Sequence, residues 1–265
     1  MFSKWQLAAK YLNYYLTASN GKGHGMHSPF IFHFITKVLN DKEHYPAYDK
    51  VEGLRNELLK DETLLAVEDL GAGSSLSKTN KRSIASIAKN AAKPKKFGQL
   101  LYRMVKAYEP AHILELGTSL GITTSYLAWA NPGASVITME GATEVATVAK
   151  RNFQQLGLTS IAMEEGNFDT VLAGVISRLP EVGLAFIDGN HRREPTERYF
   201  RDLLPKINND SIMIFDDIHW SGEMEQAWET IKAHPSVRCT VDLFFIGIVF
   251  FRAEFREKRD FSIRF

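Results

Sequence analysis

Cysteine is nearly absent from this chain of 265 residues, because Cys239 is the only one. A single cysteine excludes a disulfide bond within the chain and any zinc site made of clustered cysteines. An excess of charge of one sign is also missing, since 32 Lys and Arg residues balance 31 Asp and Glu residues. The composition therefore favours neither a nucleic-acid partner nor a membrane partner.

Long apolar runs are missing as well, and no stretch approaches the roughly 20 apolar residues that span a bilayer. The first residues, MFSKWQLAAKYLNYYL, mix Lys, Gln and Asn into their apolar positions and lack the small-residue cleavage pattern of a signal peptide. Hydrophobic residues make up 45% and charged residues 24% of the chain, as in ordinary globular proteins. We therefore expect a globular protein of the cytoplasm.

From about residue 111, short apolar runs alternate with helical patterns. The runs predict strands at 112–116, 135–140, 160–164, 183–188 and 211–217. Strands that alternate with helices favour a parallel sheet with right-handed crossovers. The predicted fold class is therefore α/β.

The pattern changes after a further predicted helix at 223–233. VRCTVDLFF and IGIVFFR are two strand-like runs separated by little more than a turn, so we expect them to pair antiparallel. The tail RDFSIRF (259–265) also alternates like a strand. We expect the tail to dock either on this sheet or on a partner subunit. In the second case the protein would be a homodimer.

The first 92 residues show no such alternation, and we interpret them as a helical cap on a domain that spans 93–265. Helical patterns occur at 5–17, 29–39, 54–67 and 83–108. His24, His27 and His33 lack the regular spacing of a zinc site. The phenylalanines of 29–34 either line a substrate pocket or pack the cap onto the domain.

The stretch HILELGTSLG (112–121) places two glycines between a predicted strand and a predicted helix. Its spacing, Glu115-x-Gly117-x-x-x-Gly121, is not the G-x-G-x-x-G of nicotinamide-dependent enzymes. A carboxylate just before such a turn suits a ligand with a positive charge. Glu140, at the end of the next predicted strand, can accept the hydroxyls of a ribose. S-Adenosylmethionine carries both groups, whereas the alternative is a turn that serves packing alone.

A second glycine-rich stretch, VEDLGAGSS (67–75), follows no predicted strand. The residues before it, DETLLAVEDL, have a helical composition, so the simplest interpretation is a helix that ends at Gly71. The alternative is a loop with Lys78, Lys81 and Arg82 that folds over the active site.

Three aspartates end neighbouring predicted strands, Asp188 at the fourth and the pair Asp216 and Asp217 at the fifth. Ligands of open parallel sheets bind at the carboxyl ends of the strands, so we expect these carboxylates in one crevice. Their mutual repulsion calls for a cation, and an oxygen-only set suits Mg²⁺, with Mn²⁺ or Ca²⁺ as relatives. The alternative is that the aspartate pair caps a turn. His191 and His219 follow these acids, and an imidazole can remove a hydroxyl proton near neutral pH.

The segments ILELGTSLGITTSYLA, VITMEG, FIDGNH and IFDDIHW together resemble the metal-dependent class I O-methyltransferases, which include the catechol and macrolide-sugar enzymes. The similarity covers roughly residues 93–252. It implies a Rossmann-like sheet of parallel strands with a C-terminal antiparallel hairpin and an N-terminal helical cap. It also implies methyl transfer from S-adenosylmethionine to a hydroxyl of a small molecule, assisted by Mg²⁺ or a related cation.

The resemblance further implies roles for individual residues. The methionine end of the cofactor is assigned to the glycine turn at Glu115, Gly117, Thr118, Ser119 and Gly121. The ribose is assigned to Glu140, and the adenine to the turn of Asn167, Phe168 and Asp169. The cation is assigned to Asp188, Asp216 and Asp217. Asp188 is also expected to contact the cofactor and to act in catalysis with His191 as the general base.

Two positions depart from the family pattern. Phe168 stands where the catechol enzyme has a small polar residue, and Asp217 stands where it has Asn, which adds a negative charge. Trp220 is expected to wall the substrate pocket. Two alternatives remain open at this point: a methyltransferase that needs no metal, and a catalytically silent module that binds S-adenosylmethionine.

Overall fold

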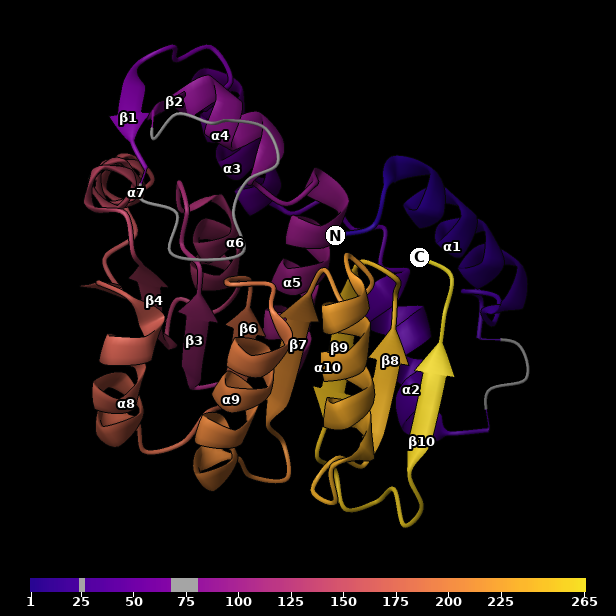
Figure 1. Cartoon of the computed structure of the whole chain (residues 1–265). Helices are drawn as coiled ribbons and strands as arrows, with labels where there is room; N and C mark the ends of the chain where they lie inside the picture. Colours follow the sequence, from indigo (N-terminus) through magenta and orange to yellow (C-terminus); the bar gives the residue numbers. More distant parts are fainter. Residues whose placement is uncertain (24–26, 68–80) are drawn as a thin grey trace. The chain divides into compact units, whose positions relative to one another are not determined.

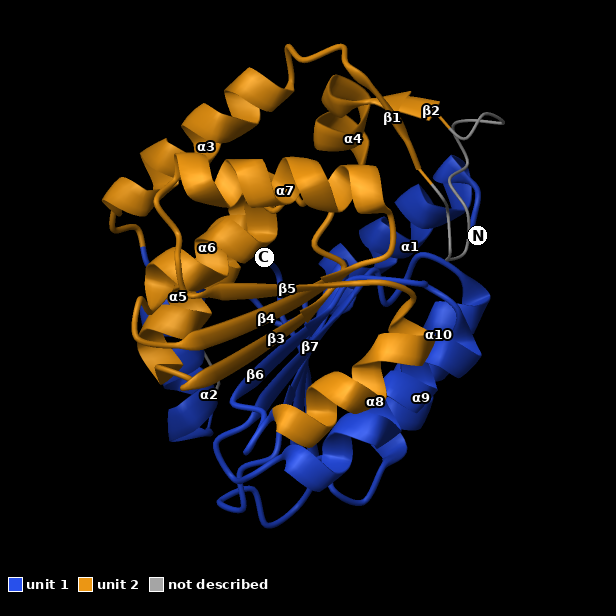
Figure 2. Cartoon of the chain, turned by 90° about the vertical axis from the view of Figure 1, so that its left-hand side faces the viewer, with its two compact units in different colours: residues 1–41, 179–265 blue, residues 42–178 orange. Residues whose placement is uncertain are grey.

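The computed structural model describes residues 1–23, 27–67 and 81–265 (Figure 1). The chain forms two compact units: unit 1 comprises residues 1–41 and 179–265, and unit 2 comprises residues 42–178 (Figure 2). The cap boundary expected at residue 92 coincides with neither limit of these units and stays a prediction. Among the described residues, no helix has the length and apolar character needed to cross a membrane.

Parallel strands form the sheet of unit 2. They are β3 (His112–Leu116), β4 (Ser135–Glu140) and β5 (Ile161–Glu165). The central strand, β4, pairs with both neighbours, so that Glu115 lies beside Thr138 and Glu140 beside Glu165. These strands confirm the sequence predictions to within one residue, because each apolar run is bounded by turn residues that stop it.

The helices of unit 2 cover both faces of these strands. They are α3 (Pro46–Leu58), α4 (Ile84–Asn90), α5 (Lys95–Tyr108), α6 (Ile122–Ala130), α7 (Thr143–Gln155) and α8 (Phe168–Arg178). Helices α5, α6 and α7 lie on one face and α8 on the other (Figure 2). Gly98 of α5 lets α6 approach closely, because a Cβ there would lie 2.7 Å from the ring of Tyr126.

Two of the helical predictions for unit 2 are wrong in their limits. The segment 54–67 is not one helix, because α3 ends at Leu58 and β1 (Leu64–Ala66) pairs antiparallel with β2 (Lys81–Ser83). Asp61 turns the chain, since its side chain accepts a hydrogen bond from the backbone N–H of Thr63 at 2.9 Å. The segment 83–108 holds two helices, and Pro94 stands just before the second.

The earlier glycine-rich stretch falls mostly outside the described residues. Gly71, the expected helix end, and Lys78, expected in a loop over the active site, both belong to the part left undescribed. Lys81 and Arg82, the other basic residues of that expected loop, belong to β2. The choice between a helix end and a covering loop therefore stays open.

Unit 1 carries the remaining strands in the order β10-β8-β9-β7-β6. They are β6 (Leu184–Ile187), β7 (Ile212–Asp216), β8 (Cys239–Asp242), β9 (Ile246–Phe250) and β10 (Arg259–Ser262). Strands β6 and β7 are parallel, and β8 and β9 form the predicted antiparallel hairpin. The tail docks on the sheet, because β10 pairs with β8.

Helices cover both faces of the sheet of unit 1. They are α1 (Lys4–Thr17), α2 (Pro29–His33) with a π-helical turn (Phe34–Leu39), α9 (Arg193–Leu203) with a 3-10 turn (Leu204–Lys206), and α10 (Gly222–Ala233). Helices α9 and α10 lie in front of the strands in Figure 1, and α2 lies behind them. The rings of Phe30 and Phe34 pack on Phe250 of β9, with centroids 4.9 and 5.9 Å away. These phenylalanines therefore pack helix on sheet.

Candidate active site

The glycine turn after β3 is the strand-to-helix turn that the sequence predicts. Gly117 and Gly121 have φ angles of 108° and 79°, which lie in the left-handed region that favours glycine. A Cβ on Gly121 would overlap the ring of Phe153 on α7. Replacing Gly121 therefore requires the ring of Phe153, the turn or a flanking helix to shift.

The carboxylate of Glu140 lies at the end of β4, next to this turn. Its Oε2 accepts a hydrogen bond from the backbone N–H of Ser119 at 2.8 Å, and its Oε1 accepts one from Ala142 at 3.0 Å. The backbone carbonyl of Glu140 accepts a hydrogen bond from Gly166 at 2.9 Å. The structure thus brings together the predicted ribose acid, the glycine turn and the start of the predicted adenine turn.

Glu115 lies deeper than its predicted role requires. Its side chain is fully buried and accepts hydrogen bonds from the hydroxyls of Thr124 and Thr138, the latter at 2.6 Å. Thr118 is buried too, and its hydroxyl lies 2.6 Å from that of Thr138. These contacts hold β3, β4 and α6 together around the turn. The contacts of Glu115 and Thr118 with the cofactor stay predictions.

The predicted adenine turn begins helix α8. Oδ1 of Asn167 accepts a hydrogen bond from the backbone N–H of Asp169 at 2.9 Å, which turns the chain into the helix. Phe168 is half-buried, whereas Asp169 is exposed. A partly open aromatic ring offers a face on which a purine can stack. Its contact with an adenine stays a prediction.

In unit 1, two carboxylates and an imidazole gather where β6 and β7 end. Asp188 follows β6, Asp216 ends β7, and His191 lies in the turn after Asp188. One ligand atom of each lies within 4.8 Å of those of the other two. Nε2 of His191 is 3.5 Å from Oδ1 of Asp188. The set of two oxygen donors and one nitrogen donor is suited to a divalent cation.

The cluster of Asp188, His191 and Asp216 is partly open on one side. Asp216 is 1% exposed, whereas the side chains of Asp188 and His191 are 15% and 24% exposed. The turn beside it is strained, because Asn190 and His191 have φ angles of 68° and 40°. Such left-handed residues cost of order 1 kcal/mol or more each, and they concentrate at functional sites. The strained backbone therefore makes this turn a candidate functional site.

Asp217, the third predicted cation ligand, does not belong to the cluster of Asp188, His191 and Asp216. It has a φ of 52°, and its backbone N–H donates a hydrogen bond to the carbonyl of Phe245 at 2.7 Å. Its side chain lines a neighbouring pocket, and His191 supplies the third donor of the cluster instead. Sequence reasoning missed His191 as a donor, although its position three residues after Asp188 in a turn is a usable signal. Cation binding by Asp217 stays a prediction.

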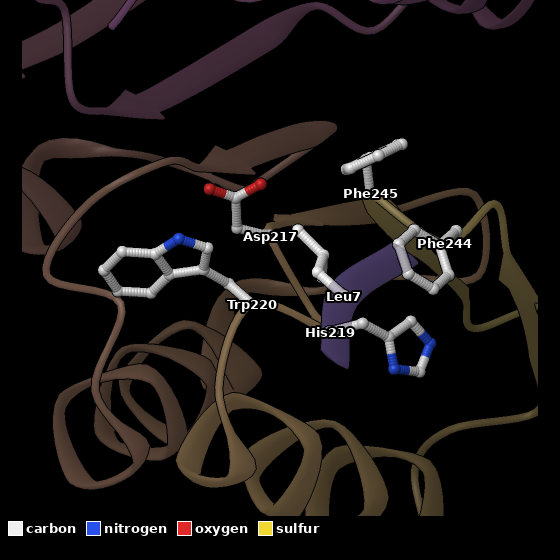
Figure 3. A pocket seen from close by; sticks show the side chains of 6 residues that line it. All are labelled: Leu7, Asp217, His219, Trp220, Phe244 and Phe245. Atoms are coloured by element: carbon white, nitrogen blue, oxygen red, sulfur yellow. The ribbon is translucent and has the colours of Figure 1, made fainter. Parts of the chain in front are cut away.

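An aromatic pocket of about 190 Å³, its open mouth included, adjoins the cluster. It is lined by Leu7, Asp217, His219, Trp220, Phe244 and Phe245 (Figure 3). The ring centroid of Trp220 lies 5.7 Å from that of His191, so Trp220 does wall a pocket beside the cluster. Figure 3 shows Leu7 reaching from α1 between Trp220 and the phenylalanines. Sequence reasoning missed Leu7, because nothing in the sequence links α1 to this loop.

His219 is held between two acids. Its Nδ1 lies 3.0 Å from Oε1 of Glu225, and its Nε2 lies 2.8 Å from Oδ2 of Asp242. Burial alone would lower the pKa of His219, but the hydrogen bonds and charges of Asp242 and Glu225 outweigh burial and raise the pKa. Glu225 also pairs with Nζ of Lys10 at 2.9 Å. An imidazole so engaged does not suit the role of a second base.

Solved methyltransferases share this fold. A methyltransferase of Podospora anserina bound to S-adenosylhomocysteine has a TM-score of 0.57 at 11% identity, over 95% of this chain and 97% of that one. An O-methyltransferase of Streptomyces achromogenes that is involved in tomaymycin synthesis, in complex with S-adenosylmethionine, has a TM-score of 0.57 at 15% identity, over 79% of this chain and 91% of that one. An O-methyltransferase of Bacillus cereus reaches 0.54 at 19% identity, over 83% and 97%. The fold is thus the Rossmann-like class I methyltransferase fold.

Sequence comparison gives the family. Residues 114–218 match a family described as a methyltransferase domain. A catechol O-methyltransferase of Niastella koreensis is 30% identical over 167 residues, which are 61% of this chain and 72% of that protein. The chain therefore belongs to the S-adenosylmethionine-dependent class I O-methyltransferases.

Proposed function

We propose that the protein transfers a methyl group from S-adenosylmethionine to a hydroxyl of a small, ring-bearing molecule, and that a divalent cation assists the transfer. The observation that carries this proposal is the cluster of Asp188, His191 and Asp216 beside an aromatic pocket. Acidic groups this close repel one another unless a cation or a proton relieves them. A strand end that served packing alone would not need two carboxylates so close together.

Residues of unit 2 bind the methyl donor. Glu140 is fixed by two backbone N–H groups, and its remaining lone pairs can accept the ribose hydroxyls. Gly117 allows the backbone to approach the methionine end of the donor, and Phe168 stacks on the adenine. Glu115 keeps the turn in shape through Thr124 and Thr138.

Asp188 and Asp216 hold the cation. Their oxygen atoms suit Mg²⁺ or Mn²⁺. When bound, the cation supplies Lewis acidity that favours loss of the substrate's hydroxyl proton. Asp217 adds a negative charge beside the cluster, which strengthens the attraction for a cation.

His191 accepts the proton of the substrate hydroxyl on its imidazole. The partly open side chain can be reached by a ligand, and its ring lies beside Trp220 in the wall of the pocket. Oδ1 of Asp188, 3.5 Å from Nε2, balances the positive charge that His191 gains. His191 and Asp188 thus act as the catalytic pair.

The aromatic pocket holds the ring of the acceptor. Trp220 and Phe245 offer flat apolar faces, and Leu7 closes the pocket from α1. The 190 Å³ include the open mouth, so the pocket encloses only part of an acceptor ring and leaves no room for a large substrate. The pocket therefore favours small aromatic or sugar-like molecules that carry a hydroxyl.

Calorimetry tests this assignment. We expect Asp216→Asn to bind S-adenosylhomocysteine as the wild type does, but to lose affinity for Mn²⁺ by about 100-fold or more, since a charged oxygen donor is removed. The matched control is Asp210→Asn, an exposed aspartate of the same unit that pairs with Arg252. Equal Mn²⁺ affinity in Asp216→Asn and wild type would favour a methyltransferase that needs no metal.

A further inference from the structure

We propose that α1 pairs with α1 of a second copy of this chain, through an exposed apolar surface that we call the α1 stripe. The α1 stripe consists of Trp5, Ala8, Ala9, Leu12 and Leu16, whose spacing places them on one face of the helix. Trp5 is 87% exposed, Leu12 58% and Leu16 67%. This proposal does not depend on the proposed reaction.

Exposed apolar side chains concentrate on this helix. Among the described residues, ten large hydrophobic side chains are exposed, and six of them lie within the first 16 residues. The six are Met1, Trp5, Tyr11, Leu12, Tyr15 and Leu16. Isolated exposed apolar residues are normal on protein surfaces, but a contiguous group marks a contact surface.

The opposite face of α1 is already fixed to unit 1. Tyr14 is buried, its hydroxyl donates a hydrogen bond to the carbonyl of Ile263, and it packs with Phe244 at 5.3 Å. Nζ of Lys10 pairs with Glu225 at 2.9 Å. The helix therefore cannot rotate to bury its stripe without losing these contacts. A helix that is apolar on two opposite faces is one that packs on both.

Charge favours a second copy over a membrane surface. The first 40 residues contain neither Asp nor Glu, yet α1 itself carries only Lys4 and Lys10 as cations. Lys10 is committed to Glu225, so Lys4 alone could attract anionic lipids. Peripheral attachment by charge takes a cluster of about four or more basic residues, each worth about 1 kcal/mol. The α1 stripe itself carries no charge, so the uncharged α1 stripe of a second copy is a suitable partner for it.

An antiparallel pairing fits the sizes of the side chains. Ala8 and Ala9 leave room in the middle of the α1 stripe for Leu12 of the second copy, while Trp5 packs against its Leu16. Lys4 then lies near the C-terminal carbonyls of the second α1, where the helix dipole favours a cation. One helix per copy buries less than the roughly 800 Å² per partner of a standard interface, so we expect a dimer of micromolar affinity.

Sedimentation of the full chain from about 1 to about 200 µM tests the pairing. We expect a reversible dimer, and Leu12→Glu should raise its dissociation constant about 100-fold, because a charge is buried at the centre. Leu64→Glu is the matched control, since Leu64 is exposed to a similar extent, 63%, but lies in unit 2. Circular dichroism melting checks that both variants fold. A wild type that stays monomeric throughout, or a Leu12→Glu dimer as stable as the wild type, overturns the proposal.

Cross-linking tests the direction of the pairing. Chains with Lys4→Cys and chains with Thr17→Cys, at opposite ends of α1, are mixed and treated with a short bismaleimide, which spares the fully buried Cys239. Antiparallel helices give the cross-linked dimer only in the mixture, whereas parallel helices give it with each chain alone and overturn the antiparallel arrangement. Sedimentation with anionic vesicles tests the alternative that the α1 stripe binds a lipid surface. Vesicle binding by a monomeric wild type that Leu12→Glu abolishes would assign the α1 stripe to a lipid surface and overturn the pairing.

Discussion

Oε2 of Glu140 lies 2.8 Å from the backbone nitrogen of Ser119, so the acid that ends β4 fixes the glycine turn that follows β3. Ser119 has a φ of 49°, an unfavourable angle for a serine, and this hydrogen bond offsets part of that strain. The same carboxylate receives a second backbone N–H from Ala142. Glu140 therefore shapes the donor site as well as offering acceptors to a ribose.

Glu140→Gln should weaken the binding of S-adenosylhomocysteine about 10- to 100-fold, because the amide turns a donor toward one of the two N–H groups and loses the charge. Calorimetry measures the change. Glu164→Gln is the control, since Glu164 lies in the neighbouring strand β5 of unit 2 but pairs with Arg178 at the surface. If Glu140→Gln bound S-adenosylhomocysteine as tightly as the wild type, Glu140 would not be a binding residue of the donor site.

Gly121→Ala should lower the free energy of unfolding by about 2–4 kcal/mol, because its Cβ overlaps the ring of Phe153 and its φ is left-handed. Denaturant unfolding measures the loss. Gly174→Ala is the matched control, since Gly174 lies inside α8 with open space around it. The control should be stabilised by up to about 1 kcal/mol. Equal stability of the two variants would contradict the close packing of the turn.

His191→Ala should lower kcat about 100-fold or more while leaving Mn²⁺ affinity nearly unchanged, because the imidazole serves as the base rather than as an essential ligand. Rates at saturating acceptor and Mn²⁺ titrations separate the two roles. His33→Ala, an exposed histidine of the same unit, is the control. A large fall in Mn²⁺ affinity in His191→Ala would make His191 a cation ligand, as its place in the cluster also permits.

His219 should make stability depend on pH. Its folded pKa is raised above the ordinary value of 6.5, so its contribution is fully present below pH 6.5 and is lost as the pH rises through the raised pKa. The stability lost in His219→Gln should therefore be greatest near pH 6 and smaller near pH 9. Unfolding by denaturant at both pH values measures it.

His234 provides a control of opposite sign. Burial, together with the charge of Lys258, lowers the pKa of His234, so its contribution grows as the pH rises through the lowered pKa toward 6.5. The stability lost in His234→Gln should accordingly be smaller at acid pH than at neutral pH. If His219→Gln lost the same stability at pH 6 and pH 9, the ion pairs of His219 with Glu225 and Asp242 would not hold in solution.

The sequence predicts the parts of this protein that local patterns determine. Strands β3 and β4 match their predicted limits, because apolar runs bounded by turn residues leave little choice. The segment 54–67 is mispredicted, since apolar residues such as Leu64 and Leu65 fit a helix as well as a strand. Only pairing with Lys81–Ser83, which is distant in sequence, decides between them.

The candidate site divides in the same way. Asp188 and Asp216 are predictable, because strand ends in a parallel sheet meet at one edge. Asp217 is adjacent in sequence, but its left-handed backbone directs the side chain into the pocket. Leu7 enters that pocket from α1, which depends on tertiary contacts such as the pairing of Lys10 with Glu225. No sequence pattern carries that information.

The most direct test of the proposed function measures the transfer of labelled methyl groups from S-adenosylmethionine to small hydroxyl-bearing rings, with and without EDTA. We predict that EDTA abolishes transfer, that Mg²⁺ or Mn²⁺ restores it, and that Asp216→Asn cannot be restored. Transfer that continues unchanged in EDTA, and equally in Asp216→Asn, would contradict the account.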